Sequence, residues 1–193
     1  MIRAALACTA LALVSCATLP ARMKLDVPAP RWRLATVDGD TLHSEGVAGK
    51  VVVYAWIDPT CPEVQTAVDG GALRILERRW MNDERVTVLY VASMPTSGPS
   101  GLGVADWKPW IKEMHLRGPV LLDSQKTLAK AWNVQRIPTA GIVDARGLVR
   151  WSGPVDAMDS LGDPALSTAV GEALEGRSAW TPELDPEGSC RVR

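Results

Sequence analysis

The stretch WIDPTCPEV, from Trp56 to Val64, contains the residue best suited to chemistry in this chain, Cys61. An apolar run ends at Ile57, shortly before the cysteine, and Pro62 follows it. Proline is favoured at the first position of a helix, so we expect Cys61 at a helix start. Unpaired backbone N–H groups and the helix dipole favour an anion there, and such a setting can lower a thiol pKa from about 8.5 to roughly 3.5–7.5. The sequence therefore predicts a nucleophilic thiolate at Cys61.

Neighbouring side chains are expected to affect the pKa of this thiol, some raising it and others lowering it. Asp58 and Glu63 place negative charge near Cys61, and such charge raises a thiol pKa. Thr60 is a hydrogen-bond donor beside the sulfur, and Arg136 has the sign of charge that would offset the two carboxylates. Two interpretations of Cys61 stay open: a reactive thiol that Thr60 assists, and a cysteine without turnover.

The chain has four cysteines, and only two of them lie beyond the N-terminal segment. Cys8 and Cys16 belong to that segment, which leaves Cys61 and Cys190. A long tail can bring Cys190 to a surface site, because loop-closure entropy grows slowly with loop length. Three relations are open: Cys190 resolves an intermediate on Cys61, the two form a permanent structural disulfide, or the tail thiol is unrelated to the site.

The N-terminal segment resembles a bacterial lipoprotein signal. Residues 1–15 combine one basic residue with a short Ala/Leu-rich run, too short for the roughly 20 residues of a membrane-spanning helix. The residues LVSC resemble a lipobox that ends at Cys16, and Ala17 after it favours the outer over the inner membrane. We expect a lipid on Cys16 that anchors the chain on the periplasmic side of the outer membrane. The alternative is an ordinary signal peptide cut near Ala17 or Ala21.

The rest of the chain is interpreted as one domain between a Pro/Ala-rich segment and a polar tail. We expect a tether over residues 16–30, a domain over 31–176 and a C-terminal tail over 177–193. The net charge of −1 gives no support to a nucleic-acid partner or an anionic membrane surface. An extracytoplasmic compartment would let a disulfide persist.

Hydrophobic patterning predicts alternating strands and helices. Val51–Ile57 and Arg85–Ala92 have the unbroken apolar character of strands buried on both faces. A helix is expected from Pro62 to Leu76, weakened at Gly70-Gly71. Further elements are a hairpin at 31–42, helices at 107–114, 124–132 and 164–174, and strands at 120–122, 138–143 and 148–152. This order predicts an α/β sandwich with a mixed central sheet.

Four stretches together resemble the thioredoxin-like superfamily, in its redoxin branch with the alkyl hydroperoxide reductase/thiol-specific antioxidant group. They are GKVVVYAWI, DPTCP, GPVLLDSQKTLAKAWNVQRIPT and AGIVDARGLVRWSG. The resemblance implies a three-layer α/β/α sandwich with a mixed sheet and an N-terminal β-hairpin. It also places Pro138 in the family's cis-proline loop, which packs against the active cysteine. Ile137, Pro138, Thr139 and Pro62 would then line a site for an extended substrate.

The chain departs from the motifs of its relatives at several positions. Val64 replaces the second cysteine of Cys-x-x-Cys, so that motif cannot resolve a mixed disulfide. Tyr54 and Asp58 stand where peroxidase members have proline and threonine, and Gln65 stands where copper-chaperone relatives have a cysteine. The two histidines, His43 and His115, are expected at the surface. We therefore expect neither a metal nor a cofactor.

These features lead to two classes of function. The first is a cell-envelope thiol oxidoreductase in which Cys61 attacks a disulfide or a peroxide, and Cys190 or an external thiol resolves the intermediate. Its partners would be envelope protein thiols and disulfides or small peroxides. The second is a non-catalytic thioredoxin-fold module that binds a partner or serves as a scaffold.

Overall fold

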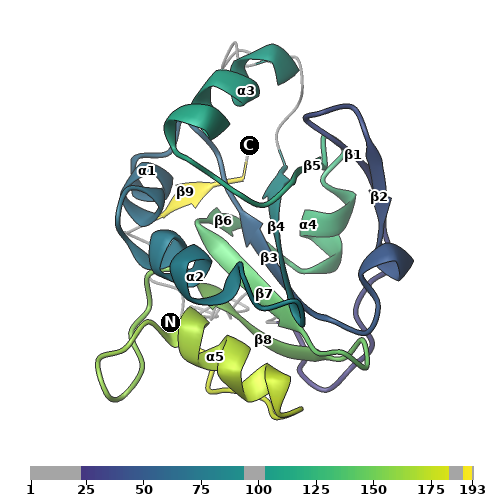
Figure 1. Ribbon diagram of the computed structural model, residues 1–193, viewed down its shortest axis with the longest axis vertical. Coiled ribbons are helices and arrows are strands. Elements are labelled where there is room, and N and C mark those ends of the chain that lie inside the picture. The colour runs from purple at the N-terminus through teal and green to yellow at the C-terminus, as the bar shows by residue number, and fades with distance from the viewer. Residues whose placement is uncertain (1–22, 94–102, 183–188, 193) are drawn as a thin grey trace, which may run out of the picture.

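A single mixed sheet organises the computed structural model, which describes residues 23–93, 103–182 and 189–192 (Figure 1). The seven strands run in the order β2-β1-β5-β4-β3-β7-β8. Strand β3 pairs in parallel with β4, and antiparallel with β7 on its other side. The strands are β1 (Arg33–Thr36), β2 (Thr41–His43), β3 (Val51–Trp56), β4 (Val86–Ala92), β5 (Val120–Leu122), β7 (Thr139–Val143) and β8 (Val149–Pro154). The predicted α/β class, mixed sheet and N-terminal hairpin are confirmed.

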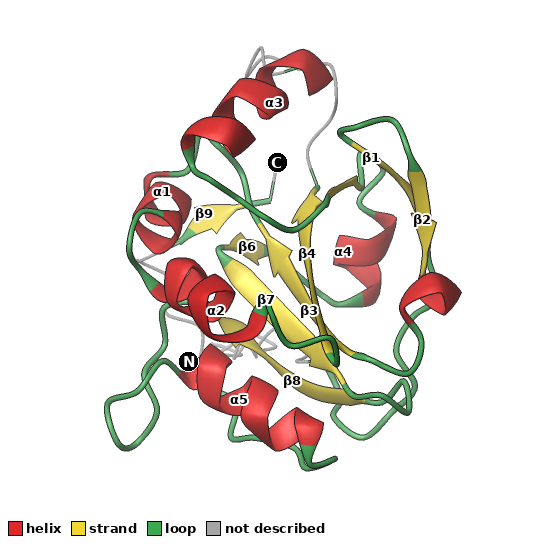
Figure 2. Cartoon of the chain, in the orientation of Figure 1, coloured by secondary structure: helices red, strands yellow, loops and turns green. Residues whose placement is uncertain are grey.

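Helices flank this sheet (Figure 2). Helices α1, α2 and α5 lie side by side, while Trp132 at the end of α4 packs on Tyr54 and Trp56 of β3. All six residues of β3 are buried, as the apolar run at Val51–Ile57 predicts. The helices are η1 (Ser44–Val47), α1 (Pro62–Val68), α2 (Ala72–Trp80), α3 (Val104–Glu113), α4 (Thr127–Ala131) and α5 (Ala165–Leu174). The chain leaves β3 at Trp56 and reaches the buried Cys61 through the turn that follows.

The helix expected from Pro62 to Leu76 is two helices, α1 and α2. Gly70 between them has φ of +114°, a conformation that a residue with a side chain rarely adopts. A Cβ on Gly71 would lie 2.7 Å from the carbonyl oxygen of Thr66, so the chain can turn there only with glycine. The glycine pair thus ends one helix and starts another, whereas the sequence predicted a single helix that is only weakened at this point.

The helix expected from Ser124 begins three residues later, at Thr127. Its start is capped by Asp123, whose carboxylate accepts hydrogen bonds from the backbone N–H groups of Leu128 and Ala129 at 3.1 and 2.9 Å. Asp123 is 1% exposed, so these two bonds satisfy a buried carboxylate. The side chain of Asp123 therefore holds the start of α4.

Described residues of both segments that flank the expected domain lie against β8. Within the expected tether, the N–H of Asp26 donates to the carbonyl of Val149, and its carboxylate pairs with the buried Arg150. In the expected tail, the carbonyl of Trp180 accepts from Nε1 of Trp151 at 2.9 Å. The expected signal at residues 1–15 and Cys16 lie outside the described residues. No described helix has both the length and the apolar character that crossing a membrane requires.

One further pairing stands apart from the main sheet and had no sequence signal. Strand β9 (Cys190–Arg191), at the end of the tail, pairs antiparallel with β6 (Arg136–Ile137). In Figure 1 this yellow strand lies beside α1 and near β6, both far from it in sequence. The pairing brings Cys190 to the start of α1.

Candidate active site

Cys61 lies where a tight turn joins the central sheet to α1. Its backbone N–H donates to the carbonyl of Asp58 at 3.0 Å, which closes the turn after β3. Pro62 occupies the first position of α1, and Cys61 is the residue before it, as the sequence predicts. The helix has only seven residues, so its dipole alone is a weak source of stabilisation for a thiolate. The side chain of Cys61 is 1% exposed.

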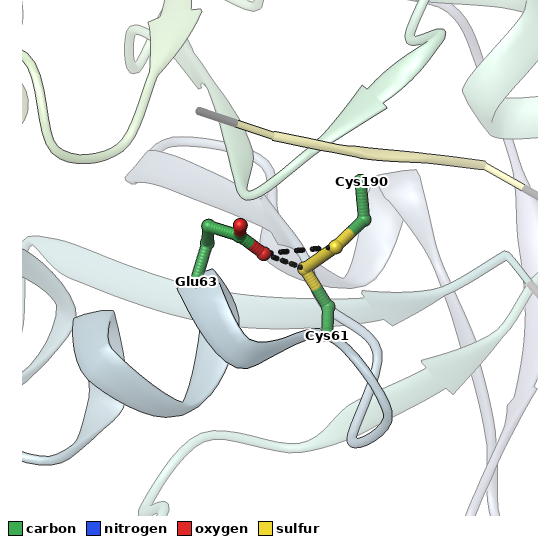
Figure 3. A group of neighbouring side chains, drawn as sticks. All are labelled: Cys61, Glu63 and Cys190. Atoms are coloured by element: carbon green, nitrogen blue, oxygen red, sulfur yellow. Dashed lines mark hydrogen bonds between the residues drawn. A yellow bond between two sulfur atoms is a disulfide. The ribbon is translucent and has the colours of Figure 1, made fainter. Parts of the chain in front are cut away.

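Cys61 forms a disulfide with Cys190, across 129 positions of sequence (Figure 3). The two Cα atoms lie 6.1 Å apart, within the usual range for a disulfide. As a residue, Cys190 is partly exposed, whereas Cys61 is buried. The interpretation of Cys190 as an unrelated tail thiol is therefore wrong, and the catalytic and structural interpretations of the pair remain.

Glu63 reaches both sulfurs of this disulfide. Its Oε2 lies 3.0 Å from Sγ of Cys61 and 2.9 Å from Sγ of Cys190, as Figure 3 shows. Neither sulfur carries a proton in the disulfide, but either thiol of the reduced pair can donate to this oxygen. The sequence interpretation treated Glu63 only as an unfavourable charge. It missed the shared position because nothing in the sequence places Cys190 beside α1.

The loop around Pro138 forms the opposite side of the site. The Ile137–Pro138 peptide bond is cis, and the carbonyl oxygen of Ile137 lies 3.9 Å from Sγ of Cys61. Thr139 is buried, and its hydroxyl donates to the carbonyl of Arg136 at 2.7 Å. The structure thus brings Pro62, Ile137 and Pro138 together around the cysteine, while the hydroxyl of Thr139 fastens the loop.

Thr60 and Asp58 bond to each other rather than to the sulfur. The hydroxyl of Thr60 donates to Oδ1 of Asp58 at 2.7 Å, and the backbone N–H of Thr60 donates to the same oxygen at 2.8 Å. Asp58 is 3% exposed, so these bonds satisfy a buried acid in the turn. The hydrogen bond that the sequence suggested from Thr60 to Cys61 is absent from the described contacts, and Thr60 instead shapes the turn.

Tyr54, which stands at the proline position of the peroxidase motif, also lies in the core. Burial raises the pKa of the Tyr54 phenol to about 12, although Nε1 of Trp32 donates to its oxygen and acts in the opposite direction. Tyr54 therefore stays a neutral hydroxyl that accepts one hydrogen bond. Tyr54 therefore does not supply the proline, nor Asp58 the threonine, of the peroxidase motif.

Arg136, expected to offset the acidic neighbours, instead contacts the tail. Its Nη1 donates to the backbone carbonyl and the hydroxyl of Ser189 at 3.1 and 3.3 Å. The expected surface placement holds for His43 and His115, which are both exposed. Cys61, Glu63 and Cys190 are residue types that bind metals, but the disulfide leaves no thiolate to act as a ligand.

Comparisons with known proteins agree on family and fold. The AhpC/TSA family model matches residues 25–152. The structure is similar to that of a hypothetical protein from Sinorhizobium meliloti 1021, with 18% identity and a TM-score of 0.74 over 89% of this chain and 95% of that one. No curated protein sequence matches significantly.

Two further similar structures carry descriptive names. A thiol:disulfide interchange protein of the thioredoxin family from Chlorobium tepidum TLS has 22% identity and a TM-score of 0.60, over 80% of this chain and 99% of that one. The pneumococcal exposed lipoprotein thioredoxin from Streptococcus pneumoniae has 23% identity and a TM-score of 0.57, over 74% and 99%. At these identities the likeness establishes the thioredoxin-like fold.

Proposed function

The chain belongs to the AhpC/TSA family, and from that premise we propose that it is a thiol–disulfide oxidoreductase whose redox couple is Cys61 and Cys190. One observation carries the proposal. The family's cysteine position, at the start of α1 beside the cis-Pro138 loop, is bonded to a partner that arrives on a separate strand. A second cysteine delivered by the tail replaces the one that Val64 removes from the usual motif.

The position of Glu63 supports exchange at this disulfide. A thiol must lose its proton to attack and a thiolate must gain one when it leaves, and Oε2 of Glu63 lies within 3.0 Å of both sulfurs. One carboxylate can therefore serve both cysteines without moving far. Proton transfer by a positioned side chain typically accelerates a step by about 10²–10⁴-fold.

The proposed reaction has two steps and conserves electrons. The Cys61 thiolate attacks one sulfur of a substrate disulfide, which forms a mixed disulfide and releases the first substrate thiolate. The Cys190 thiolate then attacks Sγ of Cys61, which releases the second substrate thiol and forms the Cys61–Cys190 disulfide. Two electrons pass from the protein dithiol to the substrate. An external thiol reductant returns them through attack on the partly exposed Cys190.

A disulfide fits the site better than a peroxide as oxidant. Asp58 occupies the position of the peroxidase threonine and is buried, with its Oδ1 bonded to Thr60. A carboxylate there repels the developing negative charge of a leaving alkoxide. We therefore place peroxide reduction second.

We further propose that the protein acts in the cell envelope, anchored by a lipid on Cys16. The support is the signal-like N-terminal sequence together with a disulfide, which persists in oxidising compartments. Substrates would then be thiols and disulfides of envelope proteins.

The test measures whether reduction of a substrate disulfide oxidises Cys61 and Cys190 to their disulfide. The full chain with Cys8→Ser and Cys16→Ser, in detergent, is reduced, freed of reductant and mixed with one equivalent of a peptide disulfide. We expect one Cys61–Cys190 disulfide to form for each peptide disulfide consumed, measured by mass after acid quenching and alkylation. Hydrogen peroxide in a parallel arm compares the two oxidants. A dithiol that stays reduced beside the peptide disulfide would contradict the proposal and favour a scaffold or binding module.

A further inference from the structure

The tail occupies the edge of β6 as a short antiparallel strand. Cys190 pairs with Ile137, Arg191 pairs with Arg136, and the N–H of Val192 donates to the carbonyl of Gln135 at 3.0 Å. β6 ends directly at cis-Pro138, so this strand presents its cysteine to Cys61 from the edge of the loop. Backbone pairing of this kind is independent of side chains and accepts any extended polypeptide.

Side chains along the tail alternate between the site and the solvent. Cys190 and Val192 are partly buried, whereas Arg191 between them is exposed. This is the two-residue period of a strand with one face against the protein. Sequence preference at this edge can therefore arise at the cysteine and at the second residue after it, but not at the residue between them.

Val192 lies at a small, mainly apolar recess. Trp56 and Ile57 at the end of β3, Val91 of β4 and Ile137 of β6 line it, together with the buried polar residues Asp58 and Ser93. The space that remains between these residues and Val192 is about 10 Å³, about the least that holds one water molecule, so little room is left beside the valine side chain. On the other side of the cysteine, Arg136 donates to the carbonyl and the hydroxyl of Ser189 at 3.1 and 3.3 Å, and any residue at that position can offer the first of these contacts.

We infer that the tail is a built-in copy of the substrate strand, and that the substrates of this site are extended polypeptides with a cysteine followed two residues later by a small aliphatic residue. This inference rests on the proposed function. The reaction then exchanges one strand for another on the same edge: the substrate segment forms the mixed disulfide on β6, leaves as a thiol, and the tail replaces it as Cys190 bonds to Cys61. Val192 and the substrate's aliphatic residue occupy the same recess in turn.

The test compares peptides that differ only in residue order. The full chain with Cys8→Ser, Cys16→Ser and Cys190→Ser keeps Cys61 as its single thiol. The peptides GSCRVR, which matches the tail, and GSCVRR each carry thionitrobenzoate on the cysteine, and its release is followed by absorbance. We expect the first to react about tenfold faster, which is the order of effect of burying one aliphatic side chain.

A second comparison probes competition by the tail. In the same background, Val192→Ser weakens the tail's hold on the recess and should accelerate the reaction of the matching peptide severalfold. Arg191→Ser is the matched control, since Arg191 is exposed, and should leave that rate unchanged. Equal rates for both peptides together with no effect of Val192→Ser would overturn the inference while the proposed function stands. No reaction with either peptide or with dithionitrobenzoate would overturn both.

Discussion

Cys61→Ser is expected to reduce disulfide-exchange turnover to the uncatalysed background, while Cys190→Ser is expected to stop the reaction after its first step. Cys61 supplies the sulfur that attacks the substrate in the proposed scheme, so its loss removes the first bond-forming step. Without Cys190, the substrate stays bound to Cys61 as a mixed disulfide. Turnover is measured with a dithiol reductant and a chromogenic peptide disulfide, and the trapped adduct by intact mass.

Each of the two variants serves as the stability control for the other. Each lacks the same Cys61–Cys190 crosslink, so each should lose a similar free energy of unfolding, about 2–4 kcal/mol. Equal melting temperatures with different kinetic behaviour then assign the difference to chemistry. Turnover by Cys61→Ser, or a Cys190→Ser protein that never holds the substrate covalently, would contradict the assigned roles.

Glu63→Gln is expected to produce two opposite effects. Closure of the Cys61–Cys190 disulfide should slow by roughly 100-fold, because the amide cannot accept the thiol proton that the carboxylate accepts at about 3 Å. Alkylation of reduced Cys61 at pH 7 should become faster. Removal of the adjacent negative charge lowers the thiol pKa and increases the thiolate fraction. Stopped-flow closure and iodoacetamide alkylation measure the two rates.

Slower disulfide closure together with faster alkylation would distinguish a role of Glu63 in proton transfer from a structural role. Glutamine has nearly the shape of glutamate, and a residue that only positions α1 would change both rates in the same direction or neither. Glu84→Gln is the matched control, because Glu84 is exposed in the turn before β4. Slower alkylation in Glu63→Gln would show that the carboxylate does not act on the Cys61 thiol as proposed.

Local sequence patterns predicted most of the fold that holds Cys61. The apolar run at Val51–Ile57 indicated a strand buried on both faces, and Pro62 indicated the helix start that places the cysteine. The motif ending at Thr139 resembled the family loop that lies opposite the site. These features depend on residues close together in sequence, and single-sequence patterns report such features well.

The parts that escaped prediction depend on contacts between distant segments. Strand β9 has only two residues and pairs across more than fifty positions with β6, so no periodicity indicated it. The shared position of Glu63 follows from that pairing. Asp26 likewise reaches Arg150 only because the segment before β1 runs along β8. In each case the deciding interaction joins chain segments that no local pattern relates.

The central claim, that Cys61 and Cys190 form an exchangeable redox couple, is tested most directly by their reduction potential. The Cys8→Ser, Cys16→Ser chain is equilibrated with dithiothreitol buffers, and the oxidised fraction is measured by maleimide mass shift. Because Cys190 is partly exposed and held by a two-residue strand, we predict a reversible two-electron transition above about −300 mV. A disulfide that stays oxidised well below that potential, or opens only in denaturant, would be a structural crosslink and would contradict the account.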